Sequence, residues 1–165
     1  MLLRHYELTI PLGSMWAAFD ERGRLRYLKF GALDPRATMP LASKSQREVY
    51  RYLVRQMEAY FAGTLRTFTL PLAPQGDELQ ERVWDEVSAI PYGKTLMLDE
   101  LLRRIRGEDL RQAVGDALLE NPIQILLPTH RVIGLDSSFP GYETGSAIQK
   151  ALLTHESGPQ VDFGG

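Results

Sequence analysis

The stretch NPIQILLPTHRVIG, residues 121–134, decides how this chain is interpreted. It begins with Asn121, continues through an apolar run to a proline, and then places Thr129, His130 and Arg131 next to one another. A hydroxyl can act as a nucleophile when a base lies against it, and histidine is the most common base in proteins. The same pattern is also compatible with a buried histidine held by a carboxylate, so both interpretations stay open at this point.

The composition is that of an ordinary globular protein. The chain has 165 residues, of which 44% are hydrophobic and 24% are charged, enough for one domain of ordinary size or two small ones. The formal net charge is −2. Proteins that depend on phosphate contacts usually carry a basic excess, so any nucleic-acid-binding site here must be a local patch.

Cysteine is absent from the sequence, which excludes disulfides, thiolate metal sites and cysteine nucleophiles. The three histidines, His5, His130 and His155, are too few and too scattered to predict a metal site. The first residues contain no apolar stretch of signal-peptide length, and no run approaches a membrane span. We therefore expect a cytoplasmic protein with no metal and no membrane partner. We also expect a monomer.

The first third of the chain alternates between apolar and polar residues, which is the pattern of β-strands. Three strands are predicted, around residues 6–10, at 15–19 and at 25–30. A helix follows, with Ser45 and Glu48 as its predicted capping box and Gly63 as its end. Residues 67–70 are a candidate for a further strand.

The proline- and glycine-containing stretch at residues 71–76 is the predicted domain boundary, which divides the chain into residues 1–75 and 76–165. Beyond it the apolar periodicity is helical. The predicted fold class is therefore α/β (α+β), with a small N-terminal α/β domain and a mostly helical C-terminal domain.

Three helices are predicted in the second part of the chain. Asp77 with Gln80 begins the first one. Two short helices, at residues 97–105 and 109–120, are joined by a tight turn, which predicts helix-turn-helix geometry.

The stretch at residues 121–134 resembles the active-site signature of the DNA alkylguanine alkyltransferases, the methylated-DNA–protein-cysteine methyltransferases. That family carries Pro-Cys-His-Arg-Val after an Asn-Pro-Ile stretch. Further matching motifs follow the family's order and spacing: Val83-Trp84, Ile90-Pro91-Tyr92-Gly93, Ala113-Val114-Gly115, Gly141-Tyr142 and Leu152-Leu153-Thr154-His155-Glu156. The resemblance covers residues 79–158 strongly and the segment from Tyr6 to Leu70 more loosely.

The resemblance implies a ribonuclease-like N-terminal domain and a C-terminal domain whose helix-turn-helix binds the DNA minor groove. Members of the family flip the damaged guanine out of the base stack and move its alkyl group to the cysteine sulfur. The transfer is stoichiometric and needs no cofactor. In this chain Thr129 stands at the cysteine position, so we expect a cysteine-less, alkyltransferase-like homologue.

The catalytic positions implied by the resemblance are Thr129, His130, Glu156 and Asn121. The family lowers the thiol pKa with the following histidine, acting through water, and with a glutamate near the C-terminus, which match His130 and Glu156. Asn121 matches a hinge asparagine that ties the recognition helix to the reactive strand. Thr129 offers a hydroxyl, which ionises far less readily than a thiol.

The DNA- and base-binding positions implied by the resemblance are Leu98, Arg111, Gln112, Tyr142 and Arg131. Leu98 replaces a tyrosine that rotates the target phosphate. Gln112 replaces an arginine finger that fills the place of the flipped base, and Arg111 lies one residue earlier, about 100° around the helix. Tyr142 matches a tyrosine that packs against the flipped base.

Charges around the predicted helix pair favour two different interpretations. Asp116 and Glu120 would repel a phosphate backbone. A basic run also lies there, made of Arg103, Arg104, Arg106 and Arg111. It is either a phosphate-contacting patch or a solvated face balanced by nearby carboxylates.

Three hypotheses follow. The first is a non-catalytic protein that binds double-stranded DNA carrying alkylated guanine and flags it for a DNA-repair protein. The second is a degenerate homologue that no longer binds DNA and uses the same fold to bind a protein or small-molecule partner. The third, an active transferase that uses Thr129, is disfavoured because moving a methyl group from one oxygen to another gives no gain, whereas forming a thioether does.

Overall fold

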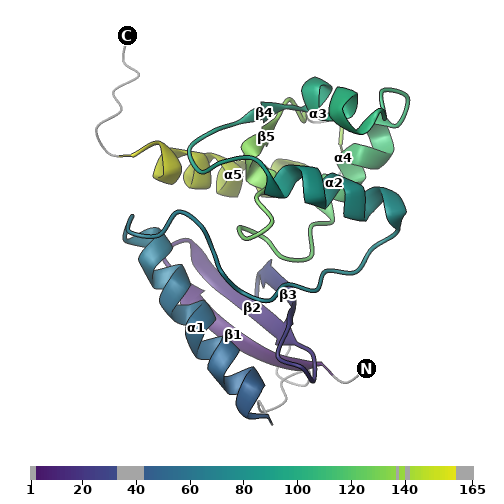
Figure 1. Cartoon of the computed structure of the whole chain (residues 1–165). Helices are drawn as coiled ribbons and strands as arrows, with labels where there is room; N and C mark the ends of the chain where they lie inside the picture. The colour runs from purple at the N-terminus through teal and green to yellow at the C-terminus, as the bar shows by residue number, and fades with distance from the viewer. Residues whose placement is uncertain (1–2, 33–42, 137, 140–141, 159–165) are drawn as a thin grey trace. The chain divides into compact units, whose positions relative to one another are not determined.

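The computed structural model describes residues 3–32, 43–136, 138–139 and 142–158 (Figure 1). The chain divides into two compact units, one made of residues 1–75 with 122–124 and the other of residues 76–121 with 125–165. The first unit is built on a small sheet and the second is mostly helical. The predicted mixed α and β class, with a sheet part followed by a helical part, is confirmed. No helix in the described ranges combines the length and apolar character that crossing a membrane requires.

The sheet of the first unit has three antiparallel strands in the order β1-β2-β3, and they confirm the predicted strands. Their bounds are β1 (Arg4–Ile10), β2 (Gly13–Phe19) and β3 (Leu25–Phe30). A two-residue turn joins β1 to β2, with Ile10 paired to Gly13. Gly13 has a φ of 127°, which a residue without a Cβ adopts without strain.

The outer edge of β3 is covered by two other segments of the chain. At Leu25, the amide donates to the carbonyl of Pro71 at 2.8 Å and the carbonyl accepts from Ala73 at 2.9 Å. Leu28 makes the same pair of bonds with Pro122 and Gln124, both at 2.8 Å. We call residues 122–124 the crossing segment, because they belong to the first unit while the residues on both sides of them belong to the second.

The predicted return of residues 67–70 to the sheet is wrong, because the chain meets β3 at Leu72 instead. Thr69 is bound to the helix rather than to a strand. Its amide donates to Gln56 Oε1 at 3.0 Å, and its hydroxyl accepts from Gln56 Nε2 at 2.7 Å.

Helix α1 (Lys44–Phe61) packs against one face of the sheet (Figure 1). The Tyr50 ring contacts Tyr6 of β1 and Phe19 of β2. The capping box predicted at Ser45 and Glu48 is wrong by two residues, because Ser43 caps the helix and Gln46 completes the box. Gln46 Nε2 also donates to the carbonyl of Asp20 at 3.0 Å, a contact that selects this earlier start.

The second unit consists of short helices around an apolar core. Its elements are α2 (Glu78–Ser88), β4 (Leu96–Met97), α3 (Leu98–Ile105), α4 (Arg111–Leu119), the 3-10 turn η2 (Thr129–Arg131), β5 (Val132–Ile133) and α5 (Tyr142–Ser157). The predicted capping box of Asp77 and Gln80 begins α2. β4 and β5 pair in parallel. Trp84 Nε1 donates to the carbonyl of Ala117 at 2.9 Å, which joins α2 to α4.

Gly115 of α4 gives the Phe139 ring room to lie against the helix backbone. A Cβ at position 115 would lie 1.9 Å from Phe139 Cε1, far inside the contact distance of two carbons. Both residues are buried. The loop after β5 is therefore fixed to α4 by an aromatic ring that only glycine admits at this point.

Candidate functional site

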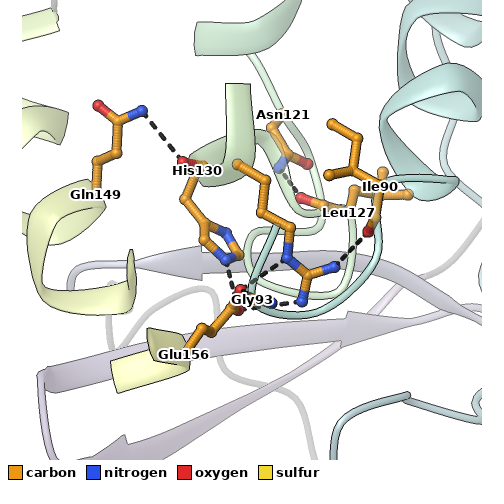
Figure 2. A network of polar contacts seen from close by, with 8 residues as sticks. Ile90, Gly93, Asn121, Leu127, His130, Gln149 and Glu156 are labelled. Carbon is orange, nitrogen blue, oxygen red and sulfur yellow. Dashed lines mark hydrogen bonds and ion pairs between the residues drawn. The ribbon is translucent and has the colours of Figure 1, made fainter. Parts of the chain in front are cut away.

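Asn121 connects the end of α4 to the segment that contains Thr129. It directly follows Glu120, the residue that ends α4, and only 1% of its surface is exposed. Its Nδ2 donates to the carbonyl of Leu127 at 2.7 Å (Figure 2) and to Thr129 Oγ1 at 2.9 Å. Both amide hydrogens are therefore used, and the Thr129 hydroxyl is held as an acceptor while its own hydrogen stays available to donate.

Glu156 of α5 is the centre of a buried polar network, in which it meets His130 of η2 (Figure 2). It also meets Arg131 of η2. His130 Nε2 lies 2.7 Å from Glu156 Oε2. Arg131 donates from Nε to Oε1 at 2.8 Å and from Nη2 to Oε2 at 3.1 Å. The exposed fractions of the three side chains are 1% for Glu156, 5% for His130 and 8% for Arg131, so water screens the ion pair between Glu156 and Arg131 little.

The network also fixes the loop after α2. Arg131 Nη1 donates to the carbonyl of Ile90 at 2.7 Å, and its guanidinium lies 5.8 Å from the centre of the Tyr92 ring. The amide of Gly93 donates to Glu156 Oε1 at 3.4 Å. Every oxygen of the buried carboxylate thus has a donor, which is the condition for keeping a charge inside a protein.

Gln149 is a residue of this site that the sequence reasoning missed. Its Nε2 donates to the carbonyls of His130 at 3.2 Å and Val132 at 2.9 Å, which joins α5 to η2 and β5. It lies seven residues before Glu156, two helical turns away, so both side chains share one face of α5. The seven-residue spacing between Gln149 and Glu156 is the sequence signal that could have identified Gln149.

The structure brings the four predicted catalytic positions into one region but as two groups. Thr129 is bound to Asn121, and His130 is bound to Glu156. Within the described part of the chain, no hydrogen bond joins the Thr129 hydroxyl to the His130 ring. In this arrangement the His130 ring is held by Glu156. It can exchange a proton with Thr129 only through a group that bridges the two side chains, such as a water molecule.

Two of the residues predicted to bind DNA are buried in the second unit. Leu98 has 1% of its surface exposed and lies in the core of the second unit. Arg131 has its donors bound to Glu156 and Ile90. Both side chains are almost fully buried, and the Arg131 donors are bound inside the protein. The prediction for Tyr142 concerns a side chain outside the described residues.

Arg111 and Gln112 are exposed at the start of α4, but both are bound to carboxylates. Arg111 Nη1 lies 2.6 Å from Asp99 Oδ1 of α3. Gln112 Nε2 donates to Asp116 Oδ1 at 3.0 Å, one turn further along α4.

The hydrogen bonds of Ser138 hold the pKa of Asp136 below its ordinary value, and the charge of Arg111 lowers that pKa further.

Two more arginines of the basic run show the same pairing. Arg103 lies 2.7 Å from Glu100, and Arg104 lies 3.5 Å from Glu100 and 3.7 Å from Glu86. Hydrogen bonding from Arg103 holds the pKa of Glu100 below its ordinary value. These contacts favour the solvated, charge-balanced interpretation of the run. In the described ranges, no cluster of three or more metal-ligating side chains is arranged around a possible ion.

Comparison with known proteins matches both parts of the chain. Residues 4–74 match the model of the ribonuclease-like domain of 6-O-methylguanine DNA methyltransferase, and residues 78–158 match that of its DNA binding domain. The methylated-DNA–protein-cysteine methyltransferase of Methanosarcina acetivorans is 40% identical over 146 residues, which are 88% of this chain and 93% of that protein.

Solved structures of Mycobacterium tuberculosis proteins share the fold. The crystal structure of its O6-methylguanine methyltransferase is 31% identical, with a TM-score of 0.78 and 97% of each chain covered. The crystal structure of OGT in complex with DNA is 32% identical, with a TM-score of 0.77, and the match covers 93% of this chain and 92% of that one.

Proposed function

The chain belongs to the 6-O-methylguanine DNA methyltransferase family, and from that premise we propose that it binds alkylated DNA without accepting the alkyl group. In this proposal the protein recognises double-stranded DNA that carries alkylated guanine and flags it for a repair protein. It is a non-catalytic member because Thr129 occupies the position of the reactive cysteine.

The observation that carries the proposal is that the polar residues beside the reactive position are present and hydrogen-bonded, whereas the nucleophile is missing. Asn121 is bound to Thr129 itself, and the neighbouring residues His130 and Arg131 are bound to the buried Glu156. The sequence contains no cysteine anywhere, so no other thiol can replace the missing one. Burying charged groups costs free energy because they lose their contact with water. That the chain keeps such a network next to Thr129 supports a protein that still presents this segment to a ligand.

The chemistry of position 129 supports binding rather than transfer. Alkyl transfer needs a soft nucleophile that ionises easily, and the thiolate, not the thiol, is the reactive form of cysteine. The Thr129 hydroxyl stays protonated and accepts a hydrogen bond from Asn121. It can donate its hydrogen to an acceptor atom of a base, which orients a ligand without forming a covalent bond.

The proposal is tested with a short duplex that carries one O6-methylguanine and an otherwise identical unmodified duplex. We expect tighter binding of the methylated duplex at low and moderate salt, and an unchanged protein mass after incubation. A methyl group found on Thr129 would overturn the non-catalytic assignment. No binding of either duplex, even at low salt, would overturn the DNA-binding assignment.

A second candidate is a homologue that no longer binds DNA, and specific contacts favour it. Leu98 is buried, Gln112 is bound to Asp116, and Arg111 is bound to Asp99. Leu98 is thus out of reach of a phosphate backbone, and carboxylates compete with a phosphate for the donors of the two exposed side chains. The duplex titration separates the two candidates directly, since only this one predicts no binding at low salt.

A further inference from the structure

The outer edge of β1 has no partner among the described residues, in contrast to the edge of β3. The sheet order is β1-β2-β3, and two segments of the chain cover β3. No hydrogen bond between described backbone groups reaches β1 from outside the sheet. Natural proteins usually block an exposed edge with proline, with lysine or with a covering segment. Residues 5–10 contain neither proline nor lysine.

The register of the sheet shows which backbone groups of β1 face outward. The carbonyl of Ser14 accepts from the amide of Gly31 at 3.0 Å, so the backbone of Ser14 faces β3. Ser14 is opposite Thr9, and backbone direction alternates along an antiparallel strand. Thr9, Glu7 and His5 therefore direct their amides and carbonyls to the open edge.

A groove of about 350 Å³ runs along this edge, between β1 and α1. We call it the β1 groove; residues 6–11 form one wall, and Tyr50, Val54, Met57, Glu58 and Phe61 of α1 form the other. The α1 residues recur at helical spacing, so they form a continuous stripe along the strand. An open strand edge beside a helix is the arrangement in which PDZ and PTB domains bind extended peptides.

We propose that the β1 groove binds an extended peptide of a partner protein, which adds as a fourth strand beside β1. Backbone hydrogen bonds to Glu7 and Thr9 would supply much of the affinity. Residues of the guest that lie beside Leu8 and Ile10 point toward α1 and are apolar. Residues beside Glu7 point to the other face of the sheet, because neighbouring strand residues alternate.

The charges of the groove select a basic guest. Glu7 and Glu58 are the charged side chains among the lining residues, and lysine and arginine are absent from the lining. A lysine or arginine opposite Glu7 is favourable, because oppositely charged cross-strand pairs stabilise a sheet. A second copy of this chain fits less well. The register in which two β1 strands overlap most fully places Glu7 against Glu7, and like charges directly opposite are destabilising.

The test uses the full chain and a fluorescein-labelled peptide as long as β1, seven residues, that alternates lysine with valine. Two further peptides serve as controls, one with glutamate in place of lysine and one with a central proline. We expect saturable binding of the lysine peptide by fluorescence anisotropy, and binding at least about tenfold weaker for each control. Amide hydrogen exchange at Glu7 and Thr9 should slow when the lysine peptide is added.

Three variants locate the binding to the groove. Thr9→Pro removes an amide that the sheet does not use, and Glu7→Lys reverses an exposed charge; each should weaken binding of the lysine peptide about tenfold. Glu48→Lys makes the same charge reversal on α1 outside the groove and should change binding less than about twofold.

Several results would overturn the proposal. Equal binding of the lysine and glutamate peptides would show that the groove does not select a basic guest. Binding that Thr9→Pro leaves unchanged would show that no strand is added. Slow exchange at Glu7 and Thr9 in the free monomer would show that the chain covers its own edge. Slow exchange that appears only as protein concentration rises would identify a second copy as the occupant. The β1 groove shares no residue with the polar network around Glu156, so the outcome is independent of the DNA titration.

Discussion

A threonine hydroxyl and a cysteine thiol at position 129 differ most in how easily they lose a proton. The reference pKa of a cysteine thiol is about 8.5, and hydrogen-bond donors to the thiolate lower it. Asn121 Nδ2 lies 2.9 Å from Thr129 Oγ1 and donates to it. The same donor would stabilise a thiolate placed there, so the surroundings of Thr129 suit a nucleophile that the residue itself does not provide.

Replacing Thr129 with cysteine should restore alkyl transfer. We expect the Thr129→Cys protein to gain the mass of one methyl group after incubation with a duplex that contains O6-methylguanine, because the donor from Asn121 favours the thiolate. Thr129→Ser keeps a hydroxyl and should stay unmodified under the same conditions. Intact-protein mass spectrometry measures both, and a folded Thr129→Cys protein that stays unmodified contradicts the prediction.

Glu156 should stabilise the fold strongly, because it neutralises a buried arginine. Glu156→Gln leaves Arg131, with 8% of its side chain exposed, without its counter-charge. We expect the free energy of unfolding to fall by about 3–5 kcal/mol, measured by urea denaturation. Glu108→Gln, at an exposed position, should change it by less than about 0.5 kcal/mol. Similar losses in the two variants would show that the network carries little stability.

Among the elements, the turn between β2 and β3 depends on one carboxylate. Asp20 Oδ1 accepts from the amides of Arg22 at 3.0 Å and Arg24 at 2.9 Å, and Oδ2 accepts from Arg24 Nε at 2.8 Å. Burial alone would raise the pKa of Asp20, but these hydrogen bonds and the Arg24 charge hold it below its ordinary value. The ionised form is therefore the one that the folded turn stabilises.

Stability supplied by Asp20 should be lost in acid. A carboxyl whose pKa is lower in the folded state than in the unfolded state stabilises the fold above its unfolded pKa, and the effect disappears as pH falls through the folded pKa. We expect Asp20→Asn to lower the free energy of unfolding by about 1–2 kcal/mol at neutral pH. The difference from the wild type should shrink below about pH 4. A difference that is constant with pH would contradict this assignment.

The contact between α4 and the loop after β5 should not tolerate a methyl group at position 115. Gly115→Ala places a Cβ against the Phe139 ring, and overpacking of this kind costs about 1–3 kcal/mol in the free energy of unfolding. Adding Phe139→Val removes the clashing ring atoms. The double variant should therefore lose less than the sum of the two single variants, as a double-mutant cycle in thermal or urea unfolding would show. Strict additivity would contradict the contact.

For the whole molecule, electrostatics should limit affinity for DNA. The net charge is −2, and Arg111 is paired with Asp99 on the surface. Asp99→Asn frees the guanidinium for a phosphate, so duplex affinity should rise at low salt and the slope of log K against log salt should steepen by up to about 1. Asp85→Asn changes the net charge equally at another exposed position and is the control. Equal effects of the two variants would mean that only net charge matters.

The sequence pattern predicted those elements whose position depends on residues close together in the chain. The strands follow from alternation, and Asp77 caps α2 as its spacing with Gln80 indicates. The start of α1 was misplaced because the contact of Gln46 with Asp20 joins residues far apart in sequence. Ile125 has a φ of 74°, which a β-branched residue rarely adopts, and no local signal marks it.

The candidate site was predictable as a set of residues but not as a set of contacts. The resemblance supplied Asn121, His130 and Glu156, and the structure joins all three to hydrogen-bond partners. It did not supply the pairing of Arg131 with Glu156, which removes that arginine from the surface. Spacing along the chain gives residue types and order, whereas burial and partner choice depend on how the helices pack.

The crossing segment has a consequence for how such proteins diversify. The polypeptide passes between the two units at residues 75–76, 121–122 and 124–125. A gene rearrangement that exchanged only the first 75 codons would import a new sheet but keep the old residues 122–124, which bond to Leu28 of β3. The β3 strand of the new sheet would have to form the same hydrogen bonds with the old residues 122–124. A working exchange of the first unit would therefore have to include residues 122–124 as well.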